Sequence, residues 1–144
     1  MKLPEYNIPD NLRYSREHEW AKIEDDIVRV GITDYAAKAL HDVVYVSLPE
    51  AGASFKQGDV AATAESIKAV SEVYCPVSGT VIEVNKTLEV NPEKINQSPY
   101  VEGWLFRLKP TNLGNDIKKL LTSKEYMNLL LSLSSLNDKH NHYY

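Results

Sequence analysis

Hydrophobic and polar residues alternate in short runs along most of the chain, and this period of two is typical of half-buried β-strands. The clearest run is at 27–32, where Val28, Val30 and Ile32 alternate with other residues, and the turn-prone pair Asp25-Asp26 before it indicates a hairpin. Similar runs predict strands at 20–24, 27–32, 43–48, 60–66, 69–77, 80–84 and 104–109. Short strands with turn signals every 8 to 12 residues or so favour a sandwich or barrel.

Two segments depart from this alternation and predict helices. Thr33 or Asp34 is placed to cap a short helix that ends near Leu40. Thr122 and Glu125 form a capping box, which predicts a short helix before it and a longer one after it. The hydrophobic residues expected to pack these C-terminal helices onto the sheet are Leu120, Met127, Leu130 and Leu131.

The last predicted strand and the chain ends complete this outline. The strand is expected to place Trp104, Phe106 and Leu108 on one face, and Leu105, Arg107 and Lys109 on the other. Residues 1–11 are interpreted as an extended arm. The fold class is therefore mainly β, a small sandwich over about 12–110 with C-terminal helices over about 115–133. Together they form one domain over 1–133, and 134–144 is expected to be a disordered tail.

Composition and charge exclude several classes of function. The chain has 144 residues, 43% hydrophobic and 25% charged, and a net charge of −4 without a Lys/Arg cluster, so no nucleic-acid partner is expected. Its only cysteine, Cys75, excludes an internal disulfide and a multi-cysteine zinc site. No apolar run reaches the ~20 residues of a membrane span, and no targeting peptide is visible at the start. A monomer is expected, located in the cytoplasm or, for a eukaryotic source, in the mitochondrial matrix.

The candidate chemistry lies at Lys68. Two strand-like runs meet at 66–69 without Gly or Pro, and the tightest reversal puts Lys68 at an exposed tip. Gly58 and Gly79 stand at similar distances on either side, so two arms of similar length can end in glycine-assisted turns. A lysine on such a tip suits enzymatic acylation, although most lysines are ordinary solvated side chains.

The segment around this lysine resembles the lipoyl-attachment segment of the glycine cleavage H-protein family. It runs Glu-Ser-Ile-Lys-Ala-Val-Ser-Glu-Val-Tyr-Cys-Pro-Val-Ser-Gly over residues 65–79. Further similar segments are His-Glu-Trp (18–20), Val-Gly-Ile-Thr-Asp-Tyr-Ala (30–36), Asp-Val-Val-Tyr-Val-Ser-Leu-Pro (42–49) with Gly52, Val-Asn (84–85), Asn-Pro-Glu (91–93), Asn96, Pro-Tyr (99–100) and Glu-Gly-Trp-Leu (102–105). The resemblance covers about residues 12–132 in one register.

The resemblance implies a barrel-sandwich hybrid of the lipoyl-domain type that is a carrier and not an enzyme. Lys68 would hold lipoic acid in amide linkage. The arm would accept an aminomethyl group from a pyridoxal-phosphate glycine decarboxylase and present it to a tetrahydrofolate-dependent aminomethyltransferase. An FAD-containing dihydrolipoamide dehydrogenase would then reoxidise it. A lipoate ligase or lipoyl transferase would attach the lipoate. Such a tether raises effective concentration at each partner.

The resemblance also implies roles for other residues. Glu65 and Gly79 would serve in recognition by the lipoylating enzyme, with Gly79 more simply explained as a turn of positive φ. His41 stands where the family more often has Gly, so a different geometry of this turn, but not a different function, is expected. Lys94 stands where the family more often has Leu, and only a loop difference is expected from the run 94–98. His18, inside the His-Glu-Trp motif, is expected to be structural.

Several alternatives were weighed against this interpretation. A nucleophilic Cys75 with His18 or His41 as base is disfavoured, because Cys75 shares its alternation phase with core positions. His140 and His142 are too few for a metal site. A biotin carrier would have Met on both sides of the lysine, and a 2-oxo acid dehydrogenase lipoyl domain more often has Asp before it. A lipoate donor that relays lipoyl groups to other enzymes stays open.

Electrostatic steering by an acidic surface around the lysine is a further hypothesis. Its members would be Glu19, Asp34, Asp42, Glu50, Glu65 and Glu72.

Overall fold

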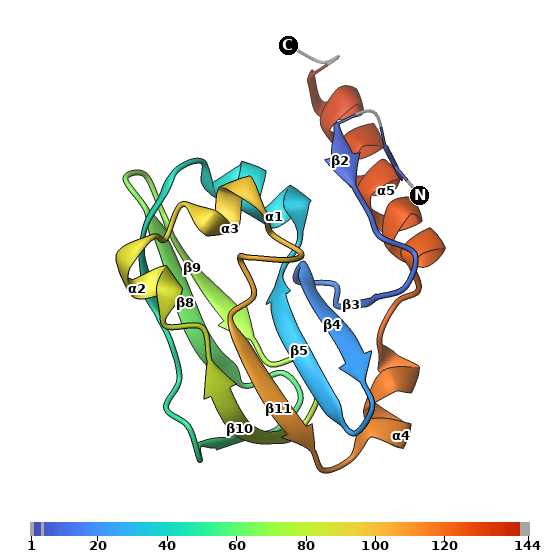
Figure 1. Cartoon of the computed structure of the whole chain (residues 1–144). Helices are drawn as coiled ribbons and strands as arrows, with labels where there is room; N and C mark the ends of the chain where they lie inside the picture. The colour runs from blue at the N-terminus through green and yellow to red at the C-terminus, as the bar shows by residue number, and fades with distance from the viewer. Residues whose placement is uncertain (1, 4, 142–144) are drawn as a thin grey trace.

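Two antiparallel sheets face each other and enclose the main core (Figure 1). The computed structural model describes residues 2–3 and 5–141, with side chains over 5–134. The larger sheet has the order β3-β4-β5-β11-β10-β7 and the smaller one β6-β8-β9. The strands of the larger sheet are β3 (Arg13–Tyr14), β4 (Glu19–Glu24), β5 (Ile27–Ile32), β11 (Phe106–Pro110), β10 (Gly79–Val84) and β7 (Ser54–Phe55). Those of the smaller sheet are β6 (Val43–Ser47), β8 (Val60–Ser66) and β9 (Val70–Tyr74).

Short helices cover one end of the sandwich and a long helix lies at its side (Figure 1). The helices are α1 (Asp34–Leu40), α2 (Thr87–Val90), α3 (Lys94–Gln97), α4 (Leu113–Asp116), the 3-10 helix η1 (Ile117–Lys119) and α5 (Ser123–Asn141). None of the helices in the described part is long and apolar enough to span a bilayer.

Two hydrophobic clusters stabilise this arrangement. The first lies between the sheets and includes Val28, Val30, Phe106 and Leu108, which the registers Phe106↔Val30 and Leu108↔Val28 place side by side. The second joins α5 to the larger sheet and to the start of the chain. Its buried members are Ile8, Leu12, Tyr14, Trp20, Leu121, Tyr126 and Leu130.

The N-terminal arm contains a small hairpin instead of being uniformly extended. Strands β1 (Lys2–Leu3) and β2 (Tyr6–Asn7) pair with each other, and β2 lies beside α5 (Figure 1). The Asn7 amide donates to Asp34 Oδ2 (2.9 Å), and the Tyr100 hydroxyl donates to the Asn7 carbonyl (2.6 Å). The arm is therefore attached to the domain by specific hydrogen bonds.

The mainly β sandwich is confirmed, with local corrections to the strands. Strand β9 ends at Tyr74 and not at residue 77, and β11 begins at Phe106, two residues later than predicted. Leu105 and Phe106 are both fully buried in the first cluster, whereas Trp104 packs against the second, so alternation between faces is broken just before β11.

The helix caps are confirmed. Thr33 Oγ1 accepts from the Ala36 amide (3.3 Å). The Thr122 amide donates to Glu125 Oε1 (2.9 Å), and the Glu125 amide donates to Thr122 Oγ1 (3.2 Å). Each cap satisfies amides that the first helical turn leaves unpaired.

Two expectations for the C-terminal helices are wrong. Leu131 is 47% exposed, because α5 turns the face carrying Tyr126 and Leu130 toward the sheet. Helix α5 also continues to Asn141, since no Gly or Pro interrupts the segment after residue 133. The pair His140 and His142 lies outside the residues whose side chains are described.

Candidate functional site

Lys68 lies at the tip of the hairpin between β8 and β9. Glu65 and Val70 form the last antiparallel pair. Beyond it, the Ser66 amide donates to the Ala69 carbonyl (2.8 Å), and the Ala69 amide donates to Ser66 Oγ (3.2 Å). Lys68 is exposed, and its amine has no ion pair among the described residues. The exposed tip expected from the sequence is confirmed, and its turn is closed by hydrogen bonds.

The turn between α1 and β6 supports the base of this hairpin. Val43 pairs with Ser66, and its amide donates to Asn96 Oδ1 (2.9 Å). Asn96 Nδ2 in turn donates to the His41 carbonyl (2.6 Å). His41 has φ 63° and ψ −152°, a backbone conformation that is usually reserved for glycine. A histidine therefore occupies this turn with a strained backbone.

Exposed hydrophobic side chains gather around Lys68. Val44, Tyr45, Ile67 and Val70 are 52%, 56%, 88% and 63% exposed, and we call these four residues the lysine patch. Beside it lies a recess of about 270 Å³ lined by His41, Asp42, Ser66, Ile67 and Lys68. Apolar side chains at this exposure are typical of surfaces that contact other molecules.

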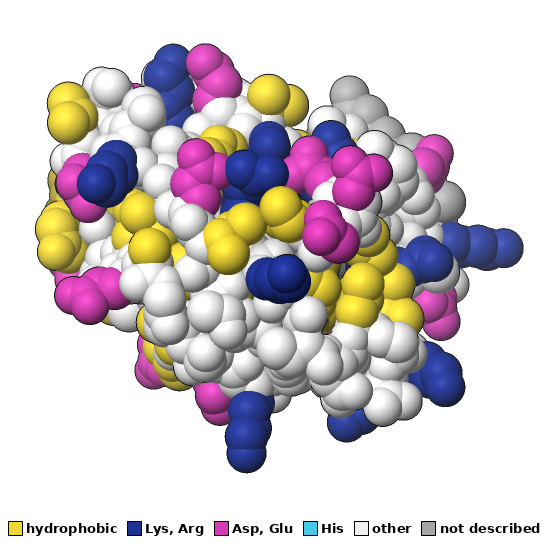
Figure 2. All heavy atoms as spheres, turned by 60° about the horizontal axis from the view of Figure 1, so that its bottom comes forward, with side chains coloured by type: hydrophobic (Ala, Val, Ile, Leu, Met, Phe, Trp, Pro, Cys, Tyr) yellow, Lys and Arg dark blue, Asp and Glu magenta, His cyan; other side chains and the backbone are white. Residues whose placement is uncertain are grey.

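The expected acidic surface is only partly present. Asp42 lines the recess, Glu65 lies in the row between Tyr45 and Val70, and Glu72 is exposed on β9. Glu19 is wrong as a member of this surface, since its side chain is 1% exposed. By contrast, acidic and basic side chains are interspersed on the face in Figure 2, where the lower end of Figure 1 comes forward.

Glycine occupies positions 58 and 79 for different structural reasons. Gly58 has φ 93°, and its amide donates to the Cys75 carbonyl (2.9 Å). Gly79 does not have a positive φ, so that expectation is wrong. It is buried at the start of β10, where a Cβ would lie 2.6 Å from the Lys109 carbonyl oxygen. Close approach of two strands therefore requires glycine at position 79.

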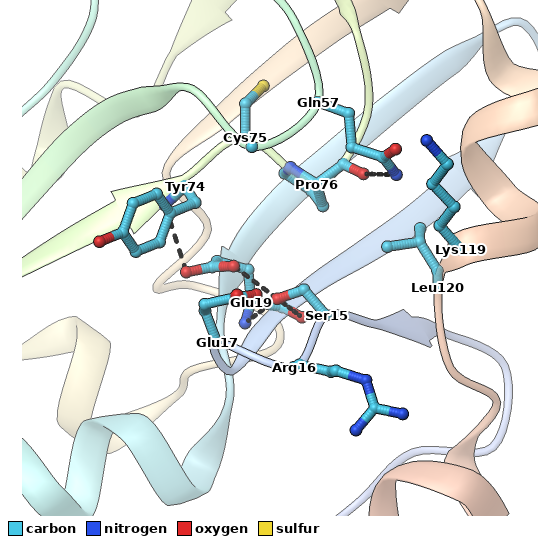
Figure 3. A pocket seen from close by; sticks show the side chains of 11 residues that line it. Ser15, Arg16, Glu17, Glu19, Gln57, Tyr74, Cys75, Pro76, Lys119 and Leu120 are labelled. Atoms are coloured by element: carbon cyan, nitrogen blue, oxygen red, sulfur yellow. Dashed lines mark hydrogen bonds between the residues drawn. The ribbon is translucent and has the colours of Figure 1, made fainter.

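A cleft of about 450 Å³ opens at the other end of β9 (Figure 3). It is lined by Ser15, Arg16, Glu17, Glu19, Gln57, Gly58, Tyr74, Cys75, Pro76, Lys119 and Leu120. At about 3.3 Å per residue, the two ends of β9 are roughly 13 Å apart. One strand therefore connects the Lys68 hairpin to this cleft.

The carboxylate of Glu19 lies at the centre of the cleft wall. Glu19 Oε1 accepts from Ser15 Oγ (2.5 Å), and Glu19 Oε2 accepts from the Tyr74 amide (3.2 Å). Within the described part of the chain Glu19 makes no ion pair. Figure 3 shows the Arg16 guanidinium directed away from it. Sequence reasoning had noted Glu19 only as a surface charge.

Burial raises the pKa of the Glu19 carboxyl to about 7, although the hydrogen bonds from Ser15 and Tyr74 oppose the effect. A buried carboxyl without a cation partner is stabilised when it loses its charge or gains a positively charged ligand. The cleft therefore contains a buried carboxyl with a raised pKa and no ion pair within the described part of the chain.

Cys75 is a core residue, as its alternation phase predicted. It is 1% exposed, and its Sγ donates to the Val77 carbonyl (3.1 Å). Burial raises the pKa of its thiol to about 12, so the nucleophilic thiolate is scarce at neutral pH. His18 Nδ1 bonds the Tyr126 hydroxyl (2.8 Å), which confirms a structural role for this histidine.

The segment that departs from the family pattern at Lys94 forms the short helix α3. Lys94 begins α3 and its Nζ lies 3.7 Å from Glu102 Oε2, an ion pair across the following turn. Ile95 is fully buried, and Asn96 holds the turn at His41. This segment therefore supports the base of the Lys68 hairpin.

Comparisons with known proteins agree over most of the chain. The glycine cleavage H-protein family model matches residues 12–132. A probable glycine cleavage system H protein of Thermococcus gammatolerans is 52% identical over 134 residues, 92% of this chain and 99% of that protein. The glycine cleavage system H protein of Thermus thermophilus is 51% identical over 126 residues, 88% of this chain and 98% of that protein.

A solved structure agrees as well. The crystal structure of a glycine cleavage system H protein from Mycobacterium marinum matches with a TM-score of 0.78 and 39% identity. The match covers 84% of this chain and 97% of that one. The chain belongs to the glycine cleavage H-protein family and is a lipoyl-carrying shuttle of glycine cleavage.

Proposed function

We propose that Lys68 is the residue that carries lipoic acid, in amide linkage to its Nζ. The observation that carries the proposal is the exposed, unpaired amine on a turn closed by Ser66 and Ala69. A ligase can reach this amine without opening the fold. When bound, lipoate supplies a disulfide that takes up a one-carbon unit and electrons. The chain itself supplies the tether, so it has no catalytic residue of its own.

We further propose that the lysine patch docks the enzymes that act on the carried group. These would be a pyridoxal-phosphate glycine decarboxylase, a tetrahydrofolate-dependent aminomethyltransferase, an FAD dihydrolipoamide dehydrogenase and a lipoate ligase or lipoyl transferase. Glu65 lies within the patch, and Asp42 lies beside it. Apolar residues with acidic neighbours fit a partner surface that is apolar with a basic rim. Glu65 is the recognition residue in this proposal, whereas Gly79 acts indirectly through strand packing.

The cleft at Glu19 is proposed to hold the cargo when it carries a primary ammonium group. Glu19 Oε1 and Oε2 would accept from the ammonium in its charged state. Such binding would lower the pKa of Glu19 below about 7, because a nearby positive charge favours the carboxylate. Withdrawal into a cleft would also reduce contact with water. A shuttle has to retain its cargo while it passes from one partner enzyme to the next.

The relay alternative has less support. The relatives carry the name of the glycine cleavage system, and no feature of the hairpin points to transfer of lipoyl groups to other chains. Glycine–carbon dioxide exchange with the decarboxylase is expected for the shuttle. Lipoyl transfer to another acceptor without that exchange would favour the relay and contradict the shuttle.

Intact mass with peptide mapping tests the Lys68 assignment. Protein from cells able to lipoylate should gain one lipoyl increment on the peptide that contains Lys68, and Lys68→Arg should abolish it. Lys86→Arg, at another exposed lysine, should retain the increment. An unmodified Lys68 in the presence of ligase and lipoate would overturn the assignment.

Glu19→Gln tests the cleft separately. This change keeps hydrogen-bonding groups but removes the charge, so lipoylation should be unaffected. The aminomethyl group carried by the arm should be released into solution about tenfold faster than from wild type, because a charge-assisted hydrogen bond is lost. Equal release from Glu19→Gln and wild type would contradict a role for the cleft.

A further inference from the structure

The turn that carries Glu19 contains a histidine in an unusual conformation. His18 has φ 74°, in the left-handed region that non-glycine residues rarely adopt. Its amide donates to the Ser15 carbonyl (3.2 Å), and its carbonyl accepts from the Thr33 amide (3.0 Å). The backbone thus turns sharply just before Glu19.

The side chain of His18 is held by the C-terminal helix. His18 Nδ1 is 2.8 Å from the Tyr126 hydroxyl, which is also 2.7 Å from Thr33 Oγ1. Tyr126 is fully buried and stacks on Tyr14, with ring centroids 4.6 Å apart and planes at 5°. The His18 ring also lies 4.5 Å from the ring of Tyr35. Aromatic rings therefore fix both ends of the His18–Tyr126 hydrogen bond.

The Tyr126 hydroxyl has to serve two partners at once. Thr33 Oγ1 already accepts from the Ala36 amide, so its proton is available to Tyr126 Oη. Nδ1 of a neutral His18 can accept from Tyr126 Oη or donate to it, depending on the tautomer. Burial lowers the pKa of His18, which favours this neutral form. A chain of hydrogen bonds therefore joins Thr33, Tyr126 and His18, and a phenyl ring cannot replace its central member.

We infer that Tyr126 is a positioning residue which, through His18, holds the turn of Ser15 and Glu19 so that the Glu19 carboxylate faces the cleft. The inference rests on the cleft role proposed for Glu19. It gives α5 a function besides packing, since Ser15 and Tyr74 hydrogen-bond Glu19 while Tyr126 hydrogen-bonds His18, the residue before Glu19.

Tyr126→Phe tests the inference, with Tyr14→Phe as matched control. Both remove one hydroxyl from the same stacked pair, but the Tyr14 hydroxyl donates to the Pro9 carbonyl and does not contact the turn. The pKa of Glu19, followed by carboxyl NMR, should fall by about one unit in Tyr126→Phe, because a loosened turn admits water. It should not change in Tyr14→Phe.

Amide hydrogen exchange gives a second measurement. The Tyr74 amide donates to Glu19 Oε2, so its exchange should accelerate about tenfold in Tyr126→Phe relative to the other amides of β9. Uniform acceleration of the whole strand would indicate mere destabilisation and overturn the inference. Should Tyr126→Phe not fold, His18→Asn breaks the same contact with a residue type that tolerates positive φ.

The outcomes separate this inference from the cleft role. Suppose that Tyr126→Phe changes neither the pKa of Glu19 nor the exchange rate of the Tyr74 amide, while Glu19→Gln accelerates release of the cargo. The positioning role then fails and the cleft role stands. If Tyr126→Phe changes the pKa of Glu19 but Glu19→Gln does not alter release of the cargo, the cleft role fails. Tyr126 then remains a positioning residue of the turn alone.

Discussion

The Lys68 hairpin and the Glu19 turn are built in similar ways but depend on different parts of the chain. A serine hydroxyl closes each one, Ser66 to the Ala69 amide and Ser15 to the Glu19 amide (2.9 Å). A histidine with positive φ lies at or beside each one, His41 at the hairpin and His18 at the Glu19 turn. The hairpin ends in solvent, whereas the Glu19 turn is covered by β9 and α5.

This difference matches what each region is proposed to do. A lysine that several enzymes must reach has to stand clear of the domain, and its turn can be held by its own hydrogen bonds. A carboxylate that holds a charged cargo has to be withdrawn from water, and burial costs free energy that distant contacts must offset. The hairpin should therefore tolerate substitution, and the Glu19 turn should not.

The largest expected effect is the pH dependence of stability due to Glu19. Its pKa rises from 4.5 to about 7 on folding, so the unfolded chain ionises first. The stabilisation is fully present below pH 4.5 and is lost as the pH rises to about 7, by up to ~3 kcal/mol at 1.36 kcal/mol per pH unit. Urea unfolding across this range should show the loss in wild type and not in Glu19→Gln. Parallel profiles for the two proteins would contradict a raised pKa.

Packing beneath the Glu19 turn gives the next largest effect. A Cβ on Gly31 would lie 2.6 Å from the indole of Trp20, which follows Glu19 and donates to the Pro99 carbonyl (3.0 Å). Gly31→Ala should lower the free energy of unfolding by about 2–3 kcal/mol, measured in urea. Gly114→Ala is the control, since nothing lies within 4 Å of the added methyl group. Equal losses in the two variants would show that the Trp20 contact is not responsible.

Sequence reasoning reached the elements that depend on neighbouring residues. The capping box of Thr122 and Glu125, the Thr33 cap and the exposed tip at Lys68 each involve residues three or four apart, so their chemistry is visible in the sequence. The turn at Gly58, where φ is positive, likewise depends on neighbouring residues.

The features that were missed depend on contacts between distant residues. Glu19 resembled a surface charge because the Tyr74 amide, which donates to its carboxylate, is 55 residues away in the sequence. Tyr126 hydrogen-bonds His18, which is 108 residues away in the sequence. Gly79 is required by the Lys109 carbonyl of another strand and not by its own φ.

Charge reversal around Lys68 should affect the rate of partner encounter more than stability. Glu65→Lys with Glu72→Lys should slow loading by the decarboxylase about tenfold at low salt and much less at high salt, because salt screens steering. Glu50→Lys is the control, since Glu50 follows the end of β6 that points away from the hairpin. Equal slowing at both salt concentrations would exclude steering.

The smallest expected effect compares the two histidines directly. His41→Gly should stabilise the protein by about 1 kcal/mol, because glycine adopts φ 63° and ψ −152° without strain. His18→Gly should destabilise it by about the same amount, since it relieves φ 74° but leaves the buried Tyr126 hydroxyl with one partner fewer. Urea unfolding of both variants, with His41→Ala as a control that retains the strain, would give these signs. Stabilisation of both variants would mean that the backbone, and not the contact with α5, decides the stability of the Glu19 turn.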